Sequence, residues 1–277
     1  MNDIDPILLE IKKHYKEERL IPFIGSGFSK PLALPDWKEL IGQIAHKIDI
    51  EPDLFVLHGS YPQLLDYIRQ KDQKVWREFL HQIKVSFDSL ESSAKRKSSL
   101  THIALSELDF RTIYTTNYDL HIEKALEDRG KEVNTLSTFN DFAQIVNKKA
   151  ASEIVKFHGT LEVDDSMILT ETQYFNRMAL EEAVDVRLRS DILSNSFLFI
   201  GYSFSDPNIR YIWYKIKKLK EQQNPNGSIN LRKSYYVTFG NQPIQETLLA
   251  NWDIIIVTLD PEDRNKSLSE FLLSIGS

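Results

Sequence analysis

The chain has 277 residues, of which 42% are hydrophobic and 27% are charged, and its formal net charge is −6. The absence of cysteine excludes disulfides, catalytic thiols and thiolate zinc sites. The acidic balance argues against general nucleic-acid binding, and neither a signal peptide nor an apolar run approaching the roughly 20 residues of a membrane span is evident. We therefore expect a soluble cytoplasmic protein without direct nucleic-acid or membrane binding, long enough for one large α/β domain with an insertion.

The first predicted elements are a helix over residues 4–18 and a buried strand over 20–24 that ends abruptly in a glycine turn. The turn supplies candidate ligand-binding residues: Gly25, Ser26 and Gly27. Glycine has no Cβ, so the backbone can approach a ligand with its N–H groups pointing outward. A strand, glycine turn and helix often bind a dinucleotide pyrophosphate. Because Lys30 replaces the third glycine of a full fingerprint, the turn alone fits a plain change of chain direction equally well.

Residues 51–109 contain no convincing strand. Three of their segments have helical spacing: 62–70, 74–87 and 98–108. The polar stretch 88–99 is predicted to be a loop. We expect a helical insertion or cap over 51–109, after the first strand of a domain formed by residues 1–50 and 110–277.

The rest of the chain alternates short apolar strands with amphipathic helices. Strands are predicted at 110–115, 133–136, 154–157, 167–169, 197–200, 235–239 and 254–259. A helix is expected to run to about residue 147, a long one to reach 193, and a loop to cover 224–230. This alternation predicts an α/β fold, a Rossmann-like parallel sheet covered by helices on both faces.

Four predicted strands end in polar or glycine sequences that are unusual for a simple turn. They are Gly25-Ser26-Gly27, Thr116-Asn117-Tyr118-Asp119, His158-Gly159 and Gly201-Tyr202-Ser203. Ligands of parallel sheets bind outside the carboxyl ends of the strands. These segments should therefore converge in space, which favours a nucleotide site over plain turns.

His158 and Asn117 are the candidate catalytic residues. An imidazole that titrates near neutral pH suits a general base, although a hydrogen-bonded structural histidine is the alternative. The Asn117 amide could hold a water or a ligand carboxamide, or cap the helix that opens at Asp119. Asp119 has the same capping alternative, because acidic residues are favoured at helix N-termini. No two histidines have metal-ligand spacing, so we expect no catalytic metal.

At these motifs the chain resembles the sirtuin family of NAD-consuming proteins, over most of its length outside the helical insertion. Gly25-Ser26-Gly27-Phe28-Ser29 is similar to the Gly-Ala-Gly-x-Ser turn of that family, Pro35-Asp36-Trp37-Lys38 to its Pro-Asp-Phe-Arg lid, Thr116-Asn117-Tyr118-Asp119 to Gln-Asn-Ile-Asp, Phe157-His158-Gly159 to its catalytic His-Gly, and Gly201-Tyr202-Ser203 to Gly-Thr-Ser. The segments 114–119 and 201–207 are most similar to a bacterial sirtuin-like branch associated with antiphage defence, whose members hydrolyse NAD.

The resemblance implies that the glycine turn and Ser203 bind the pyrophosphate and ribose, and that Asn117 and Asp119 bind the nicotinamide end. It makes His158 the base, and it adds Asp36, Ser29 and Gly201 to the residues that bind NAD. Two departures from the sirtuin pattern matter. The four-cysteine zinc module of sirtuin deacylases is absent, which argues against deacylation, and Lys38 replaces the lid arginine.

The resemblance therefore implies an NAD glycohydrolase, with NAD as substrate and no metal, that releases nicotinamide and ADP-ribose or a cyclic isomer. The enzymatic alternative is a protein deacylase or an ADP-ribosyl transferase. A non-catalytic subunit that binds NAD or ADP-ribose and drives assembly is the alternative from another class. Because an enzyme that destroys NAD must be held inactive until triggered, we expect a homo-oligomer and a partner such as an ATPase or an Argonaute-like protein.

Overall fold

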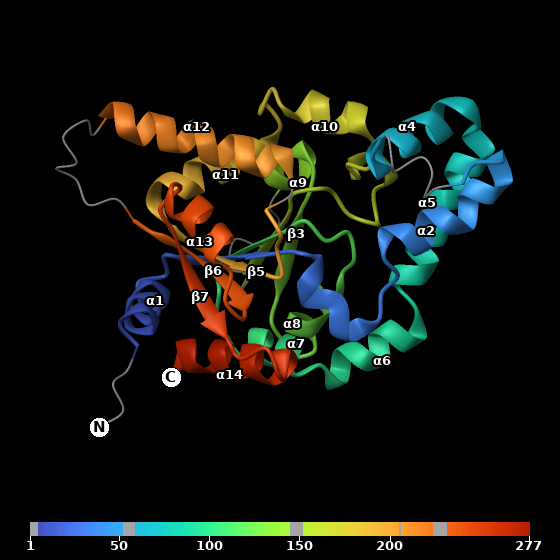
Figure 1. Cartoon of the computed structure of the whole chain (residues 1–277). Helices are drawn as coiled ribbons and strands as arrows, with labels where there is room; N and C mark the ends of the chain where they lie inside the picture. The colour runs from blue at the N-terminus through green and yellow to red at the C-terminus, as the bar shows by residue number, and fades with distance from the viewer. Residues whose placement is uncertain (1–4, 52–58, 145–151, 205, 224–231) are drawn as a thin grey trace.

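The computed structural model describes residues 5–51, 59–144, 152–204, 206–223 and 232–277, and a seven-stranded sheet lies at its centre (Figure 1). The strands are β1 (Leu20–Ile24), β2 (Thr112–Thr115), β3 (Val133–Leu136), β4 (Ser152–Lys156), β5 (Ser196–Ile200), β6 (Ser234–Phe239) and β7 (Ile254–Leu259). Their order across the sheet is β3-β4-β2-β1-β5-β6-β7, and neighbouring strands are parallel throughout. The predicted α/β class is confirmed.

Helices cover both faces of the sheet, which explains why every residue of β1 and β5 is buried and why all of them except Ser196 are apolar. One face carries α1 (Pro6–Lys16), α7 (Leu100–Ser106), α8 (His121–Glu127) and α14 (Arg264–Gly276). The other face carries α9 (Phe139–Ala143), α11 (Ala183–Ser194), α12 (Pro207–Gln223) and α13 (Pro243–Ala250). Figure 1 shows α11 and α12 above the sheet, and α7 and α14 below it. Within the described ranges, no helix has the length and hydropathy that a bilayer crossing requires.

The chain reverses direction across the sheet between β1 and β5. From the central β1 it moves to β2, β3 and β4 on one side, and it then crosses back to β5 on the other side of β1. Such a topological switch point leaves a crevice at the carboxyl ends of the two strands. This edge of the sheet is therefore where a ligand site is expected.

A third hydrophobic cluster lies beside the sheet, on the right of Figure 1. It is built from three helices, α2 (Trp37–Ala45), α4 (Tyr61–Lys71) and α5 (Gln73–Phe87), which we call the cap. Four residues from the loops that follow β2 and β4 are part of the same cluster: Tyr118, Leu161, Met167 and Leu169. The core of the cap is thus continuous with two of the strand-end loops. The division of the chain at residues 51–109 stays a prediction.

Three predicted elements differ in the structure. The stretch predicted as a loop at 88–99 contains a helix, α6 (Leu90–Ser98), which has few apolar residues and begins where the Ser89 hydroxyl accepts from the Ser92 N–H. The long helix expected up to residue 193 is two helices, α10 (Glu171–Arg177) and α11, separated by a turn with Leu180 at a φ of 58°.

The third difference concerns residues 167–169, which form no strand. Instead they run as a loop whose apolar side chains Met167 and Leu169 are buried in the cap cluster. An apolar run can fill a helical core as well as a sheet, and periodicity alone does not separate the two. The predicted helix end near 147 and the predicted loop at 224–230 lie outside the described residues.

Candidate active site

The carboxyl ends of the central strands meet through backbone hydrogen bonds. The Thr116 N–H donates to the Ile24 carbonyl at 3.1 Å, and the Gly25 N–H donates to the Ile200 carbonyl at 2.9 Å. On the far side of β2, the Phe157 N–H donates to the Thr115 carbonyl at 2.8 Å. The four segments that the sequence analysis singled out therefore adjoin one another along one edge of the sheet.

The glycine turn after β1 packs directly on the turn after β5. The Gly27 N–H donates to the Gly201 carbonyl at 2.9 Å, and Gly201 has a φ of 62°. A Cβ on Gly25 or Gly27 would lie 2.6 Å or 2.8 Å from the Gly201 oxygen. The expectation that the N–H groups of Gly25 and Gly27 point outward is wrong, because the backbone of β5 and its turn accepts both. Close packing of the two turns is what requires glycine here.

A short helix, η1 (Ser26–Leu32), follows the turn and has 3₁₀ geometry rather than α geometry. Its Ser26 is exposed, whereas its Ser29 is buried. Ser203, on the neighbouring turn, is exposed as well. Ser26 and Ser203 thus lie at the surface of the switch point, and Ser29 lies beneath it.

Asn117 is held between β2 and η1. Its backbone N–H donates to the Thr115 hydroxyl at 3.0 Å, and its Nδ2 donates to the Ser29 Oγ at 3.1 Å. The side-chain oxygen, Oδ1, is buried and has no hydrogen-bond partner in the structure. An unpaired buried acceptor is costly, so this oxygen is suited to receive an N–H or O–H group from a ligand or a water.

Asp119 is buried, and its carboxylate accepts from the backbone N–H of His121, the first residue of α8, at 3.0 Å. This is the capping interaction that the sequence left open as an alternative. The Asp119 carbonyl accepts from the Lys156 ammonium, which also pairs with Glu123 at 3.1 Å. Lys156 and Glu123 are buried, and burial raises the pKa of Glu123 although Lys156 opposes the rise. The buried Lys156 therefore ties the end of β4 to the loop that carries Asn117, through the Asp119 carbonyl, and to α8, through Glu123.

His158 follows β4 and is enclosed by aromatic rings. Its imidazole centroid lies 6.4 Å from that of Tyr118 and 5.5 Å from that of Tyr174, and the residue is only 5% exposed. The chain turns away at Gly159, which has a φ of 86°, and the Ile168 N–H donates to the His158 carbonyl at 2.9 Å. The loop 157–161 lies beside the Asn117 loop, because the Leu161 N–H donates to the Tyr118 carbonyl at 3.1 Å.

Asp206 is the site residue to which the sequence analysis gave no role. Its Oδ2 lies 2.5 Å from His158 Nε2, and both side chains are 7% exposed. The two atoms approach closely without forming an aligned hydrogen bond, since neither has a hydrogen-bond partner of good geometry. Oδ1 accepts from the backbone N–H groups of Asn208 and Ile209, at 2.8 Å and 3.3 Å, at the start of α12. An aspartate directly before a proline signals a helix cap, and that signal hid the second role.

The pKa of Asp206 lies below its usual range. Burial by itself would raise it, but the neighbouring His158 and the N–H groups of Ile209 and Asn208 outweigh burial. The carboxylate is therefore ionised at neutral pH. Burial raises the pKa of Tyr118, Tyr174 and Tyr202, and the charge on Asp206 adds to the effect, so that these phenols stay neutral.

Asp36 lies apart from this cluster in its bonding. It is exposed, its N–H donates to Glu39, and its carboxylate accepts from the Glu39 N–H at 2.9 Å, so it caps α2. The structure thus brings together Asn117 and Ser29, packs Gly25 and Gly27 on Gly201, and joins His158 to Asp206. It gives Asp36 a capping contact instead.

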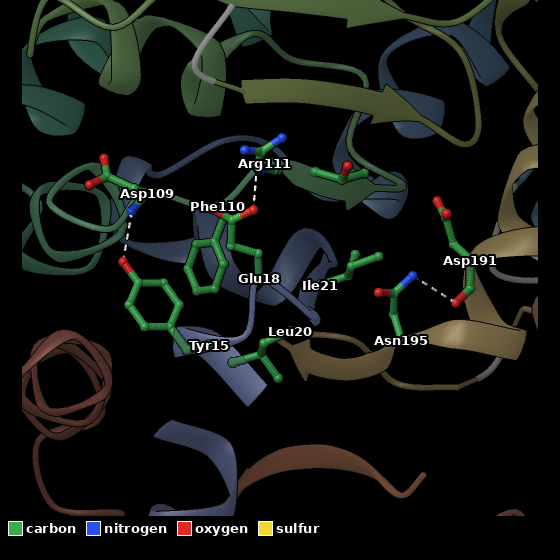
Figure 2. A pocket seen from close by; sticks show the side chains of 10 residues that line it. Tyr15, Glu18, Leu20, Ile21, Asp109, Phe110, Arg111, Asp191 and Asn195 are labelled. Atoms are coloured by element: carbon green, nitrogen blue, oxygen red, sulfur yellow. Dashed lines mark hydrogen bonds and ion pairs between the residues drawn. The ribbon is translucent and has the colours of Figure 1, made fainter. Parts of the chain in front are cut away.

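Two hollows stand out on the protein, and neither includes the strand ends. The first, of about 120 Å³, lies at the opposite edge of the sheet, where β1 and β2 begin (Figure 2). Its polar groups bond one another: Tyr15 accepts from the Asp109 N–H, and Arg111 pairs with Glu18 at 2.7 Å. The second, of about 400 Å³, lies on the cap and is lined by Lys47, Lys74, Arg77, Glu78, His81 and Gln82. The first hollow is well below the roughly 300 Å³ of a small-molecule pocket.

In the described part of the chain, no three histidine or acidic side chains gather as metal ligands would. The His158 ring lies beside the phenols of Tyr118 and Tyr174, and Asn117 is bonded to the hydroxyls of Thr115 and Ser29. The chemistry that these residues can perform is positioning and proton transfer.

The chain is similar in sequence to several known proteins. The chain is 30% identical over 244 residues to the NAD(+) hydrolase ThsA of Cytobacillus dafuensis, which covers 88% of this chain and 47% of that protein. It is 29% identical to the NAD(+) hydrolase ThsA of Acinetobacter baumannii (strain 532279), over 83% of this chain and 46% of the relative. Defense-associated sirtuin 2 of Bacillus subtilis is 22% identical over 256 residues, which are 90% of this chain and 24% of that protein.

The chain thus spans about half the length of the ThsA relatives, and less of the third protein. Residues 111–257 match the SIR2-like domain family. This match includes the strand ends that carry Asn117, His158 and Gly201. The chain belongs to the SIR2-like domain family, as the sirtuin resemblance of its motifs predicted.

Proposed function

We propose that this chain hydrolyses NAD at the bond between nicotinamide and ribose. The observation that carries the proposal is the adjacency of the Asn117 loop and the His158 loop at the switch point of a sirtuin-like sheet. The names of the ThsA relatives, which align over most of this chain, support the same reaction. The products are nicotinamide and ADP-ribose, or a cyclic isomer of ADP-ribose.

In the proposed reaction a water oxygen forms a bond to the ribose C1′ while the bond from C1′ to the nicotinamide nitrogen breaks. The bonding pair stays on the nitrogen, so the pyridinium leaves as a neutral ring and needs no acid. His158 takes the proton of the attacking water. Asn117 holds the water or the nicotinamide amide through its free Oδ1.

The remaining predicted residues bind the rest of the dinucleotide in this proposal. Gly25, Gly27 and Gly201 let the backbone lie close to the pyrophosphate, although the N–H groups of the first two are already bonded. Ser26 and Ser203 contribute hydroxyls at the surface of the switch point, and Ser29 positions Asn117. Asp119 and Asp36 complete the set, at the nicotinamide end and at the lid.

We propose further that the enzyme serves antiphage defence in the cytoplasm, as a homo-oligomer controlled by a partner such as an ATPase or an Argonaute-like protein. The name of the Bacillus subtilis relative supports a defence role. The burial of Asn117 and His158 supports control, because a closed site suits an enzyme that is inactive at rest.

Chromatographic analysis of NAD products tests the proposal. The chain, alone and with proteins encoded beside it, is expected to release nicotinamide, whereas His158→Ala and Asn117→Ala are expected to lose this activity by on the order of 10²-fold or more. His81→Ala is the matched control, because His81 is an exposed histidine of the cap. Absence of nicotinamide release in every assembly state, or full turnover in His158→Ala, would refute the reaction.

A further inference from the structure

We propose that Asp206 positions the catalytic base: its carboxylate holds Nε2 of His158, so that Nδ1 is the nitrogen that takes the proton from the attacking water. This inference rests on the proposed hydrolysis of NAD. It assigns a role to a residue that lies outside the Asn117 and His158 motifs, 48 positions along the chain from the histidine.

The contact spans the centre of the site. His158 follows β4 and Asp206 precedes α12, and the strands β2 and β1 lie between β4 and β5 in the sheet. The 2.5 Å approach of Oδ2 to Nε2 therefore passes over the carboxyl ends of the two central strands. A contact that crosses the switch point fixes the histidine relative to the strands on both sides of it.

The bonding of Asp206 determines which nitrogen carries the proton. Oδ1 is occupied by two backbone N–H groups at the N-terminus of α12, which stabilise the ionised carboxylate. An ionised carboxylate only accepts hydrogen bonds, so the nitrogen that faces Oδ2 must bear hydrogen. In a neutral imidazole the other nitrogen, Nδ1, is then the acceptor.

The surroundings leave Nδ1 available for this task. No residue in the described ranges forms a hydrogen bond with Nδ1 of His158. The phenols of Tyr118 and Tyr174 beside the ring stay neutral at neutral pH, because burial raises the pKa of both. Arg177, which bonds the Phe157 carbonyl, is paired with Asp185. Asp206 is therefore the charged side chain in contact with the ring.

Asp206 Oδ2 and His158 Nε2 are not aligned as a linear hydrogen bond. Hydrogen bonds of catalytic pairs are often poorly aligned before substrate binds and tighten in the complex. The same arrangement, in which an aspartate orients a histidine and fixes its tautomer, operates in serine proteases. Here it would serve attack by water rather than by a serine.

Asp206→Asn and Asp206→Ser separate positioning from capping. Both replacements keep an oxygen that can cap α12, since asparagine and serine are good N-cap residues. Asparagine places an N–H₂ group or an uncharged oxygen against Nε2, and serine is too short to reach it. Both variants are expected to lower kcat for NAD by on the order of 10²-fold, with little change in KM.

The chain contains a matched control at another helix. Asp72 caps α5 with the same pattern, accepting from the N–H groups of Lys74 and Val75 at 2.8 Å and 3.1 Å. Asp72→Asn and Asp72→Ser should shift the urea midpoint about as much as the Asp206 variants and leave turnover unchanged. If the Asp72 variants lose turnover as the Asp206 variants do, the effect of Asp206 is explained by its capping of α12 alone, and the inference is overturned.

The tautomer can be read without any activity. In protein labelled with ¹⁵N in its histidine rings, the His158 signals, identified by their loss in His158→Gln, are expected to show hydrogen on Nε2 and a bare Nδ1. Asp206→Asn should shift the population toward hydrogen on Nδ1. Hydrogen on Nδ1 in the unmodified chain, or tautomers that do not respond to Asp206→Asn, would overturn the inference.

These readouts separate the two proposals. If the chain releases no nicotinamide in any assembly state but His158 carries hydrogen on Nε2, the reaction fails and the pairing stands. If the chain hydrolyses NAD and the Asp206 variants match its kcat, the reaction stands and the positioning role fails. A rise in turnover in Asp206→Ser would mean that the contact with Asp206 inhibits the base, which also overturns the inference.

Discussion

Replacing Gly201 by alanine tests whether the contact between the turns after β1 and β5 requires glycine. At a φ of 62° an alanine is strained by about 1–2 kcal/mol. Its Cβ would also lie 2.3 Å from the Phe28 nitrogen and 2.7 Å from the Gly27 carbonyl carbon. Because carbon contacts are optimal near ~3.5–4 Å, the turns must separate by roughly 1 Å. Overpacking of this kind costs about 1–3 kcal/mol, and weakening the bond from the Gly27 N–H to the Gly201 carbonyl adds ~1 kcal/mol.

We therefore expect Gly201→Ala to lower the free energy of unfolding by roughly 3 kcal/mol or more. Gly130→Ala is the matched control, because Gly130 has a similar φ of 75° but no atom within 4 Å of the position of an added Cβ. Gly130→Ala should lower the free energy of unfolding by only about 1 kcal/mol. This is the backbone strain of alanine at positive φ, partly offset because alanine lowers the conformational entropy of the unfolded chain. Urea unfolding measures both values. Equal losses, within ~0.5 kcal/mol, would refute the reasoning that close packing of the turns requires glycine.

Two further predictions concern side chains beside the strand ends. Ser29→Ala should lower NAD turnover by roughly fivefold, because Asn117 loses the acceptor of its Nδ2 and one net hydrogen bond contributes about 1 kcal/mol; unchanged nicotinamide release would contradict it. Arg177→Met should cost about 3–5 kcal/mol in urea unfolding at neutral pH, because it leaves the buried Asp185 carboxylate unpaired. Burial raises the pKa of Asp185 already in the intact chain although Arg177 opposes the rise, and the variant should raise it further. A raised folded-state pKa means that the folded state binds the proton more tightly than the unfolded state does. The loss of unfolding free energy in Arg177→Met should therefore be smallest near pH 4 and grow as the pH rises. A loss that does not depend on pH would refute this account.

Much of the fold could be predicted because its signals are local. The wholly apolar runs at 20–24 and 197–200 fit a sheet covered on both faces, and the structure places them at its centre. The helix α6 was missed because it lacks an apolar stripe and begins at a serine cap inside a polar stretch. Its stability comes from capping and from packing on η1, α7 and α8, which periodicity does not report.

The candidate site divides in the same way. The adjacency of the Asn117 and His158 loops follows from parallel topology, so the sequence was sufficient to predict it. The hydrogen bond from the Gly27 N–H to the Gly201 carbonyl could not be predicted, because it depends on how two turns that are distant in the sequence pack together. Asp206 was hidden for a related reason: one of its oxygens has an obvious local role, and only the fold shows where the other oxygen lies.

The hydrophobic cluster of the cap has a mechanical consequence. Tyr118 and Leu161, which this cluster buries, lie in the two candidate-site loops, one residue after Asn117 and three residues after His158. A tilt of α2, α4 and α5 relative to the sheet would therefore displace both loops together, because their side chains are packed in the same cluster. A protein that binds the outside of these helices would thus act on the Asn117 and His158 loops directly through this cluster, without passing through the sheet.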